Sequence, residues 1–113
     1  MIKIYHNLRC KKSRAGLDYL QSIVKDIEVV KYLNDTPSIK ELKEIIAKTG
    51  KKPGDFIRKQ EEHYKRNMKG KELNDDQILE EMVSNPKIIE RPIVVHDDKA
   101  VLGNPPEEID KIL

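Results

Sequence analysis

The N-terminal segment of the chain has the sequence Ile2-Lys3-Ile4-Tyr5-His6-Asn7-Leu8-Arg9-Cys10-Lys11-Lys12-Ser13-Arg14. Ile2 and Ile4 alternate with a polar residue, which predicts a first strand of about four or five residues. Apolar residues then recur at helical spacing, which predicts a helix from near Lys11 to Val24. A run of β-branched residues from Ile27 to Tyr32 predicts a second strand. Because two strands joined by a helix form a βαβ unit, we expect this pair to be parallel.

Cys10 is the only cysteine of the chain, and it lies where the first strand leads into the first helix. His6 lies four residues upstream, and four cationic residues lie close in sequence: Arg9, Lys11, Lys12 and Arg14. Nearby cations and the positive end of a helix dipole favour a thiolate, so we expect a pKa well below the free value of about 8.5. The same cations and the free backbone N–H groups favour the binding of an oxyanion. A lone cysteine is often a small buried hydrophobe, but these charged neighbours favour a reactive thiol.

Composition limits the classes of protein that fit. The 113 residues suit a single domain, 1–113, and a net charge of +2 argues against a nucleic-acid-binding protein. One cysteine cannot form an internal disulfide, and candidate metal ligands are few, so no metal site is expected. The chain shows neither a signal peptide nor a membrane span. We therefore expect a cytoplasmic monomer with no nucleic-acid or membrane partner.

The middle of the chain, about residues 37–86, is predicted to be helical. Ser38 and Glu41 form a candidate capping box at the start of one helix, and Asn74 and Gln77 form another. Between them, Pro53 to Lys59 predicts a short helix. The highly charged residues 60–71 predict a solvated helix or loop.

The C-terminal part predicts a hairpin and a last helix. Third and fourth strands are expected at Arg91 to Val95 and at Lys99 to Gly103, joined by a short polar link. Asn104 is placed to cap the last helix, with Pro105 in its first turn. The order of elements is thus strand, helix, strand, several helices, hairpin, helix.

This order, with a cysteine directly after the first strand and a proline opening the third, resembles the thioredoxin fold. Residues 6–14, His-Asn-Leu-Arg-Cys-Lys-Lys-Ser-Arg, resemble the active loop of the glutaredoxin-linked arsenate reductase family, whose usual pattern is His-Asn-Pro-x-Cys-x-x-Ser-Arg. Three later segments resemble further signatures of that family in the same order: Phe56-Ile57-Arg58-Lys59, Asn74-Asp75-Asp76-Gln77 and Arg91-Pro92-Ile93-Val94-Val95. The resemblance implies an α/β protein with a four-stranded mixed sheet and helices on both faces. A helical insertion, about residues 37–86, would separate a βαβ half from a ββα half.

The resemblance also implies a chemistry. In that family a cysteine thiolate attacks arsenate and forms a covalent adduct, glutathione joins the adduct, and arsenite leaves. Glutaredoxin then reduces the mixed disulfide. No bound cofactor is expected; glutathione would be a co-substrate and glutaredoxin a protein partner.

Carried over by position, the resemblance assigns roles to individual residues. Cys10 would be the nucleophile, helped by His6, and the substrate would be bound by Ser13, Arg14, Arg58 and Arg91. A planar guanidinium matches an oxyanion bidentately, which suits the two later arginines. Pro92 is expected to follow a cis peptide bond near the site, as the thioredoxin fold has one at this position.

The residues alone leave plainer alternatives open for each assignment. His6 is equally suited to ending a strand, and Ser13 to bonding locally in the first turn of a helix. Arg58 and Arg91 are equally suited to surface ion pairs, and Pro92 to a purely architectural role.

The sequence departs from the family pattern at two positions. Leu8 replaces the usual proline, and Asn104 replaces a third arginine, which removes one positive charge from the expected arsenate pocket. A lost charge-assisted hydrogen bond costs about 1.5–3 kcal/mol. The enzyme implied is therefore an arsenate reductase or a related glutathione-dependent thiol reductase whose natural oxidant is not arsenate. An alternative function is that of the Spx-type transcriptional regulators, which share this fold, bind RNA polymerase and would lack arsenate reductase activity. Those regulators often sense oxidation through a Cys-x-x-Cys pair, whose second position is Ser13 here, so this disulfide switch is impossible.

Overall fold

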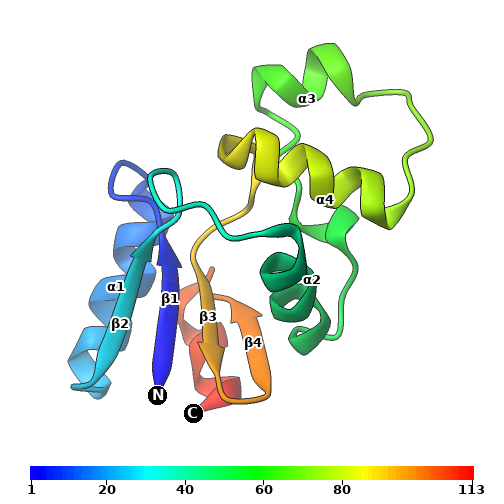
Figure 1. Ribbon diagram of the computed structural model, residues 1–113. Coiled ribbons are helices and arrows are strands. Elements are labelled where there is room, and N and C mark those ends of the chain that lie inside the picture. The colour runs from blue at the N-terminus through cyan, green and yellow to red at the C-terminus, as the bar shows by residue number, and fades with distance from the viewer.

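The computed structural model describes all residues, 1–113. Its strands are β1 (Ile2–His6), β2 (Ile27–Lys31), β3 (Ile93–His96) and β4 (Lys99–Leu102). Its α-helices are α1 (Lys11–Ile23), α2 (Ile39–Lys48), α3 (Glu62–Asn67) and α4 (Asp75–Ser84). Three 3₁₀ helices complete the fold: η1 (Pro53–Phe56), η2 (Pro86–Ile88) and η3 (Pro106–Ile112) (Figure 1).

The four strands form one mixed sheet in the order β2-β1-β3-β4. β1 and β2 are parallel, with Ile4 opposite Val29, which confirms the predicted βαβ unit. β3 is antiparallel to both β1 and β4, so Val94 lies between Ile4 and Val101. The two central strands, β1 and β3, are also the most buried of the four.

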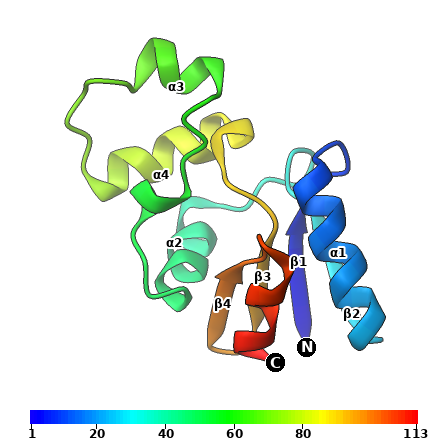
Figure 2. The same cartoon turned by 180° about the vertical axis from the view of Figure 1, so that it is seen from behind.

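Both faces of the sheet are covered by helices. Successive side chains of a strand point to opposite faces, and the apolar side chains of β1 and β3 are therefore buried on both. On one face, Ile4 and Val94 pack with Leu20 of α1 and Ile109 of η3. Figure 2 shows α1 and the C-terminal η3, in red, on this side of the sheet. On the other face, the neighbouring side chains of β1 and β3 join a core shared with the helices of the middle segment. The predicted α/β fold with helices on both faces is confirmed.

The segment from α2 to η2, which follows β2 and precedes β3 in the sequence, forms a helical lobe. Figure 1 shows this lobe on one side of the sheet. Its apolar residues belong to the same core as Tyr5 and Ile93 of the sheet, among them Leu42, Ile46, Phe56, Leu79 and Met82. The charged residues 60–71 contain the short exposed helix α3, followed by Met68, which is only 4% exposed. No helix of the structure is long and apolar enough to cross a membrane.

The two predicted capping boxes differ in outcome. At α4 both halves form, because Gln77 N–H donates to Asn74 Oδ1 (2.8 Å) and Asn74 N–H donates to Gln77 Oε1 (2.9 Å). At α2 the hydroxyl of Ser38 accepts from Glu41 N–H (3.1 Å). The Glu41 carboxylate, however, accepts from the Tyr5 hydroxyl (2.6 Å) and so ties α2 to β1.

Two predictions for local structure were wrong. The helix expected from Pro53 to Lys59 ends at Phe56, because Ile57 pairs with Ile89 in an antiparallel bridge. Asn104 does not cap the last helix; η3 is a 3₁₀ helix whose N-cap is Pro105, and the carbonyl of Pro105 accepts from Glu108 N–H (3.0 Å).

Candidate active site

Cys10 is the N-cap residue of α1 and is half-buried. The turn that precedes it is closed by Cys10 N–H, which donates to the Asn7 carbonyl (3.1 Å). The carbonyl of Cys10 accepts from Arg14 N–H (2.9 Å), the first hydrogen bond at the start of the helix. The thiol is therefore at the start of α1, as the sequence predicted, where the backbone N–H groups of Ser13 and Lys12 lower its pKa.

A buried polar network supports this turn from below. The Ser13 hydroxyl is hydrogen-bonded to His6 Nδ1 (2.7 Å) and accepts from Asn7 N–H (3.0 Å). Ser13 is 0% exposed and His6 is 2% exposed. The Asn7 carboxamide oxygen accepts from Arg9 N–H (3.0 Å), which holds the turn from its other side. Buried polar groups that satisfy one another in this way make the loop rigid.

Burial, and next the charge of Arg14, hold the pKa of His6 below its ordinary value. The imidazole is therefore neutral at neutral pH, and no hydrogen bond joins it to Cys10. The Arg14 guanidinium donates to the Leu8 carbonyl (2.9 Å). His6, Ser13 and Arg14 thus hold the loop rather than line the space above the thiol.

The pKa of Cys10 is lowered, in the direction that the sequence predicted. Burial raises it, but this effect is outweighed by the backbone N–H of Ser13, then by the Arg91 guanidinium, and then by the backbone N–H of Lys12. The charge with the largest effect on this pKa is that of Arg91, which lies 81 positions from Cys10 in the sequence. The main effects on this pKa do not include the charge of Arg9, Lys11, Lys12 or Arg14; Lys12 acts through its backbone N–H.

Arg91 lies two residues before β3 and is 7% exposed, and its peptide bond to Pro92 is cis, as expected. Its Nη1 donates to the carbonyls of Lys87 (2.8 Å) and Ile89 (3.1 Å), while its buried Nε has no hydrogen-bond partner. Pro92 packs against Gly16 of α1, where an added Cβ would lie 2.6 Å from the proline ring. Close contact between β3 and α1 therefore places Arg91 beside the Cys10 loop.

Arg58 reaches the site from the helical lobe. Its N–H donates to the Ile88 carbonyl (2.7 Å), next to the Ile57–Ile89 bridge, which joins the two arginine-bearing segments. Its Nη1 lies 3.2 Å from the Glu61 carboxylate, with both side chains mostly buried. Glu61 thereby orients the Arg58 side chain.

These segments enclose a cavity of about 460 Å³ around the thiol, which we call the thiol cavity. It is lined by one thiol, five cationic residues, one carboxylate and two amides: Cys10, Arg9, Lys11, Lys12, Arg58, Arg91, Glu90, Asn7 and Gln60. Of the residues assigned by resemblance, Cys10, Arg58 and Arg91 meet here. Asn104 does not line this cavity. Such a cationic space beside a thiolate suits a small oxyanion.

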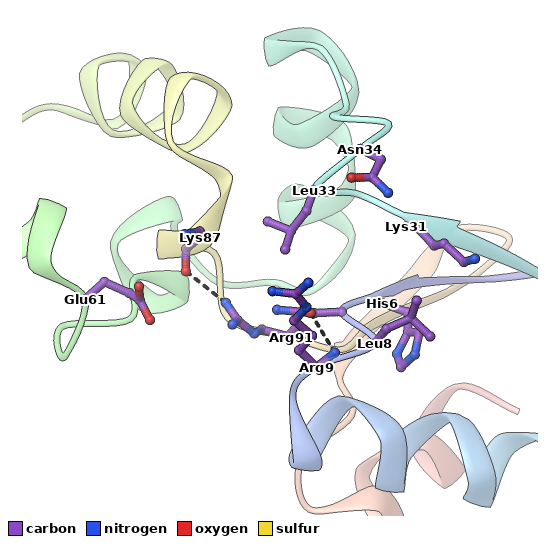
Figure 3. Close-up of a pocket in the computed structure, with 10 residues that line it drawn as sticks. His6, Leu8, Arg9, Lys31, Leu33, Asn34, Glu61, Lys87 and Arg91 are labelled. Atoms are coloured by element: carbon purple, nitrogen blue, oxygen red, sulfur yellow. Dashed lines mark hydrogen bonds between the residues drawn. The ribbon is translucent and has the colours of Figure 1, made fainter.

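A second cavity, of about 530 Å³, lies beside the first and is called the neighbouring cavity (Figure 3). Its ten lining residues are His6, Asn7, Leu8, Arg9, Lys31, Leu33, Asn34, Glu61, Lys87 and Arg91. The sequence did not single out this cavity, since its residues come from the Cys10 loop, the end of β2 and the helical lobe. Of the lining residues that the sequence analysis had not singled out, Asn7 carried a local signal, because asparagine commonly bonds its own backbone two residues on.

No group of three or more histidine, cysteine or carboxylate side chains that could hold a metal ion is present. The site itself offers a low-pKa thiol, two arginines and a polar loop.

Comparisons with known proteins place this geometry in a known context. A model of the ArsC family matches residues 5–112. The arsenate reductase of Neisseria meningitidis is 40% identical over 114 residues, covering 99% of this chain and 97% of that protein. Uncharacterized protein YfgD of Escherichia coli is 38% identical over 116 residues, covering 99% of this chain and 96% of that protein. The structure of an arsenate reductase from Vibrio cholerae matches with a TM-score of 0.93 at 40% identity, covering 99% of this chain and 97% of that chain.

Proposed function

Because the chain belongs to the ArsC family, we propose that it is a thiol-dependent arsenate reductase with Cys10 as its nucleophile. Named arsenate reductases that are 35% and 40% identical over almost the whole chain identify it as an enzyme. The observation that carries the proposal is the meeting of a low-pKa thiol with two arginines in one cavity.

Arsenate enters the thiol cavity as an oxyanion. Arg91 and Arg58 offer planar guanidinium groups that pair with two of its oxygens, and the first-turn N–H groups of α1 face the same space. Arg91 stabilises both partners, since it also favours the Cys10 thiolate. The anion and the nucleophile are thus held together, which lowers the entropic cost of their reaction.

In the first step the Cys10 thiolate attacks arsenic. A sulfur–arsenic bond forms, and one arsenic–oxygen bond breaks as its oxygen leaves, with added protons, as water. Arsenic remains pentavalent, so no electrons have been transferred. The burial of Ser13 and His6 beneath the loop keeps the thiolate in place during this attack.

Reduction requires a second thiol, and we propose glutathione as its source. The two sulfurs become a mixed disulfide between Cys10 and glutathione, and arsenic takes the two electrons and leaves as arsenite. Glutaredoxin then reduces the mixed disulfide and restores the Cys10 thiol. This cycle needs no bound cofactor. It suits a cytoplasmic monomer, because glutathione helps to keep thiols reduced in the cytosol.

Four other residues of the expected site hold Cys10 or Arg91 in place rather than bind arsenate. His6 and Ser13 position the loop through their hydrogen bond, and Arg14 does so through the Leu8 carbonyl. Pro92 packs against Gly16 and so keeps Arg91 near the loop. We therefore propose positioning roles for these residues and substrate-binding roles for Arg58 and Arg91.

The alternative of an Spx-type regulator has less support. Ser13 holds the position of the second cysteine, and its hydroxyl is occupied by His6 and Asn7. A regulator would also have no need of a cationic cavity around the thiol.

The test is arsenite production by the purified protein with arsenate, glutathione and glutaredoxin. We expect Cys10→Ser to lose activity more than about a thousandfold while its unfolding midpoint stays near that of the wild type. The matched control is the double variant Cys10→Ser/Ser22→Cys, which restores a thiol on the exposed far end of α1. The control should also be inactive; turnover in Cys10→Ser would overturn the covalent mechanism.

A further inference from the structure

We propose that the neighbouring cavity binds the reducing thiol, a small thiol that carries carboxylates, with glutathione as the type. This inference rests on the proposed reductase function and adds a binding site to it. The cavity would hold the carboxylates of the thiol while its sulfur reaches the arsenic bound to Cys10.

The proposed reaction requires a second sulfur at the arsenic. The chain has one cysteine, so the second sulfur must come from outside and must approach the arsenic in the thiol cavity. The incoming sulfur bonds to arsenic, and its proton leaves with an arsenic-bound oxygen as water. When the two sulfurs join, one sulfur–arsenic electron pair forms the disulfide and the other stays on arsenic, which leaves as arsenite.

The two cavities are contiguous. Asn7, Arg9 and Arg91 line both of them, so a molecule in the neighbouring cavity contacts residues that also border the space beside Cys10. The volume of about 530 Å³ falls within the range of about 300–1,000 Å³ that is usual for small-molecule sites. Figure 3 shows the cavity between the Cys10 loop, the loop that follows β2 and the helical lobe.

The charges around the neighbouring cavity match such a thiol. Four of its residues are cationic and one is acidic: Arg9, Lys31, Lys87, Arg91 and Glu61. Glutathione carries two carboxylates and one ammonium group, so its charges and those of the cavity are complementary. Leu8 and Leu33 provide the apolar surface that its methylene groups can cover.

Arg91 lines both cavities and leaves one of its donors unpaired. It is 7% exposed, and its buried Nε lacks any hydrogen-bond partner, whereas buried polar groups are normally satisfied. Glu61 adds a link between the cavities, because the carboxylate that lines the neighbouring cavity also holds Arg58 of the thiol cavity (3.2 Å). An ammonium group bound at Glu61 would therefore weaken the ion pair between Glu61 and Arg58.

The test uses S-methylglutathione, which has the charges of glutathione but no reactive thiol. It is titrated into the full-length protein while amide chemical shifts are recorded, a measurement that detects weak binding. We expect saturable shifts at residues that line only the neighbouring cavity, such as Leu33 and Asn34. Absence of saturable shifts, or shifts gathered elsewhere, would overturn the proposal.

A charge-reversed variant makes the test specific. We expect Lys31→Glu/Lys87→Glu to raise the dissociation constant about tenfold or more. The matched control, Lys25→Glu/Lys99→Glu, has the same net charge, and both of its sites are exposed and lie outside the cavity. The control should bind as the wild type does. Equal weakening in both variants, or wild-type binding in the first, would overturn the proposal.

A turnover assay separates this proposal from the proposed function. The ratio of the rates with glutathione and with uncharged 2-mercaptoethanol should fall about tenfold in Lys31→Glu/Lys87→Glu and stay unchanged in the control. Arsenite formed with both thiols but with an unchanged ratio would overturn the binding site and leave the reductase function standing. No arsenite with any thiol would overturn the function, while the S-methylglutathione titration still reports on the cavity by itself.

Discussion

The two walls of the thiol cavity are built in opposite ways. The loop wall, residues 6–14, is one continuous segment whose polar groups satisfy one another, as in the bond between Ser13 and His6 (2.7 Å). The arginine wall consists of residues 56–61 and 87–92, which are joined only through the Ile57–Ile89 bridge and neighbouring backbone hydrogen bonds. One wall is local in sequence, and the other exists only because the helical lobe folds back on the sheet.

This difference separates two tasks. The loop wall holds the thiol against the N-terminus of α1, while the arginine wall brings the charge that both the thiolate and an oxyanion need. Arg91 is buried and bonded to carbonyls of its own wall, so its charge and its structural role cannot be separated. Damage to the arginine wall should therefore affect stability and chemistry together, whereas damage to the loop wall can be confined.

Arg91→Lys should have the largest effect within the walls. Lysine cannot reproduce the bonds to both carbonyls and a bidentate grip on an oxyanion, so we expect kcat/KM for arsenate to fall about a hundredfold. The free energy of unfolding should fall by about 1–3 kcal/mol, measured in urea. Arg58→Lys is the matched control on the same wall, with a loss of about tenfold in kcat/KM and less than about 1 kcal/mol in stability. Equal effects of the two variants would remove the distinction drawn for Arg91.

The pH dependence of Cys10 alkylation tests which wall controls the thiol. Because the pKa of Cys10 is lowered, the iodoacetamide rate should reach half its plateau at a lower pH than for Cys10→Ser/Ser22→Cys, whose thiol lies at the other end of α1. Arg91→Lys should move the midpoint of Cys10 upward, since a group that favours the thiolate is lost. A midpoint unchanged by that variant would assign the control to the loop wall alone.

The same shift implies a change of stability with pH. The folded state favours the Cys10 thiolate, so the thiolate adds to the free energy of unfolding. This stabilisation is complete above the unfolded pKa of about 8.5. It is lost as the pH falls through the lower pKa of the folded state.

Ser13→Ala tests the loop wall by itself. The change leaves His6 Nδ1 and Asn7 N–H buried without their partner, so we expect a loss of about 1–3 kcal/mol in the free energy of unfolding. Ser22→Ala, which removes an exposed hydroxyl from the same helix, should stay within about 0.5 kcal/mol. Similar losses in both variants would mean that the buried network adds nothing to the stability of the loop.

Asn104→Arg should have the smallest effect. Asn104 lines neither cavity, so an arginine there would act on the oxyanion from a distance through solvent. We expect the KM for arsenate to fall by about fivefold or less, with kcat unchanged. A larger fall would show that position 104 belongs to the anion site after all.

Local sequence patterns predicted most of the fold, because strand alternation and helix capping depend on residues that are close in sequence. The spacing of Ile2 and Ile4, and the caps at Ser38 and Asn74, were enough to locate β1, α2 and α4. The same patterns could not show that the Glu41 carboxylate would turn to the Tyr5 hydroxyl, which lies 36 residues away. They also could not show that Ile57 would leave its predicted helix to pair with Ile89.

The candidate site also has features that local sequence predicted and features that it did not. A cysteine at a helix N-terminus among cations predicted a low pKa, and the direction was confirmed, but the charge that matters most comes from Arg91 rather than from its neighbours. Resemblance alone pointed to Arg58 and Arg91, since nothing in their local sequence distinguishes them from other arginines. No pattern pointed to the neighbouring cavity, whose walls come from three separate segments.

By itself the sequence determined the Cys10 loop, the βαβ unit and the alternation of apolar residues that covers both faces of the sheet. These features depend on backbone propensities, caps and periodicities that act within one or two turns of chain. Only the tertiary structure decided which cation faces the thiol, which polar groups are buried, and where a second molecule can approach. Those properties depend on contacts between distant segments, and a contact of that kind leaves no mark on either segment alone.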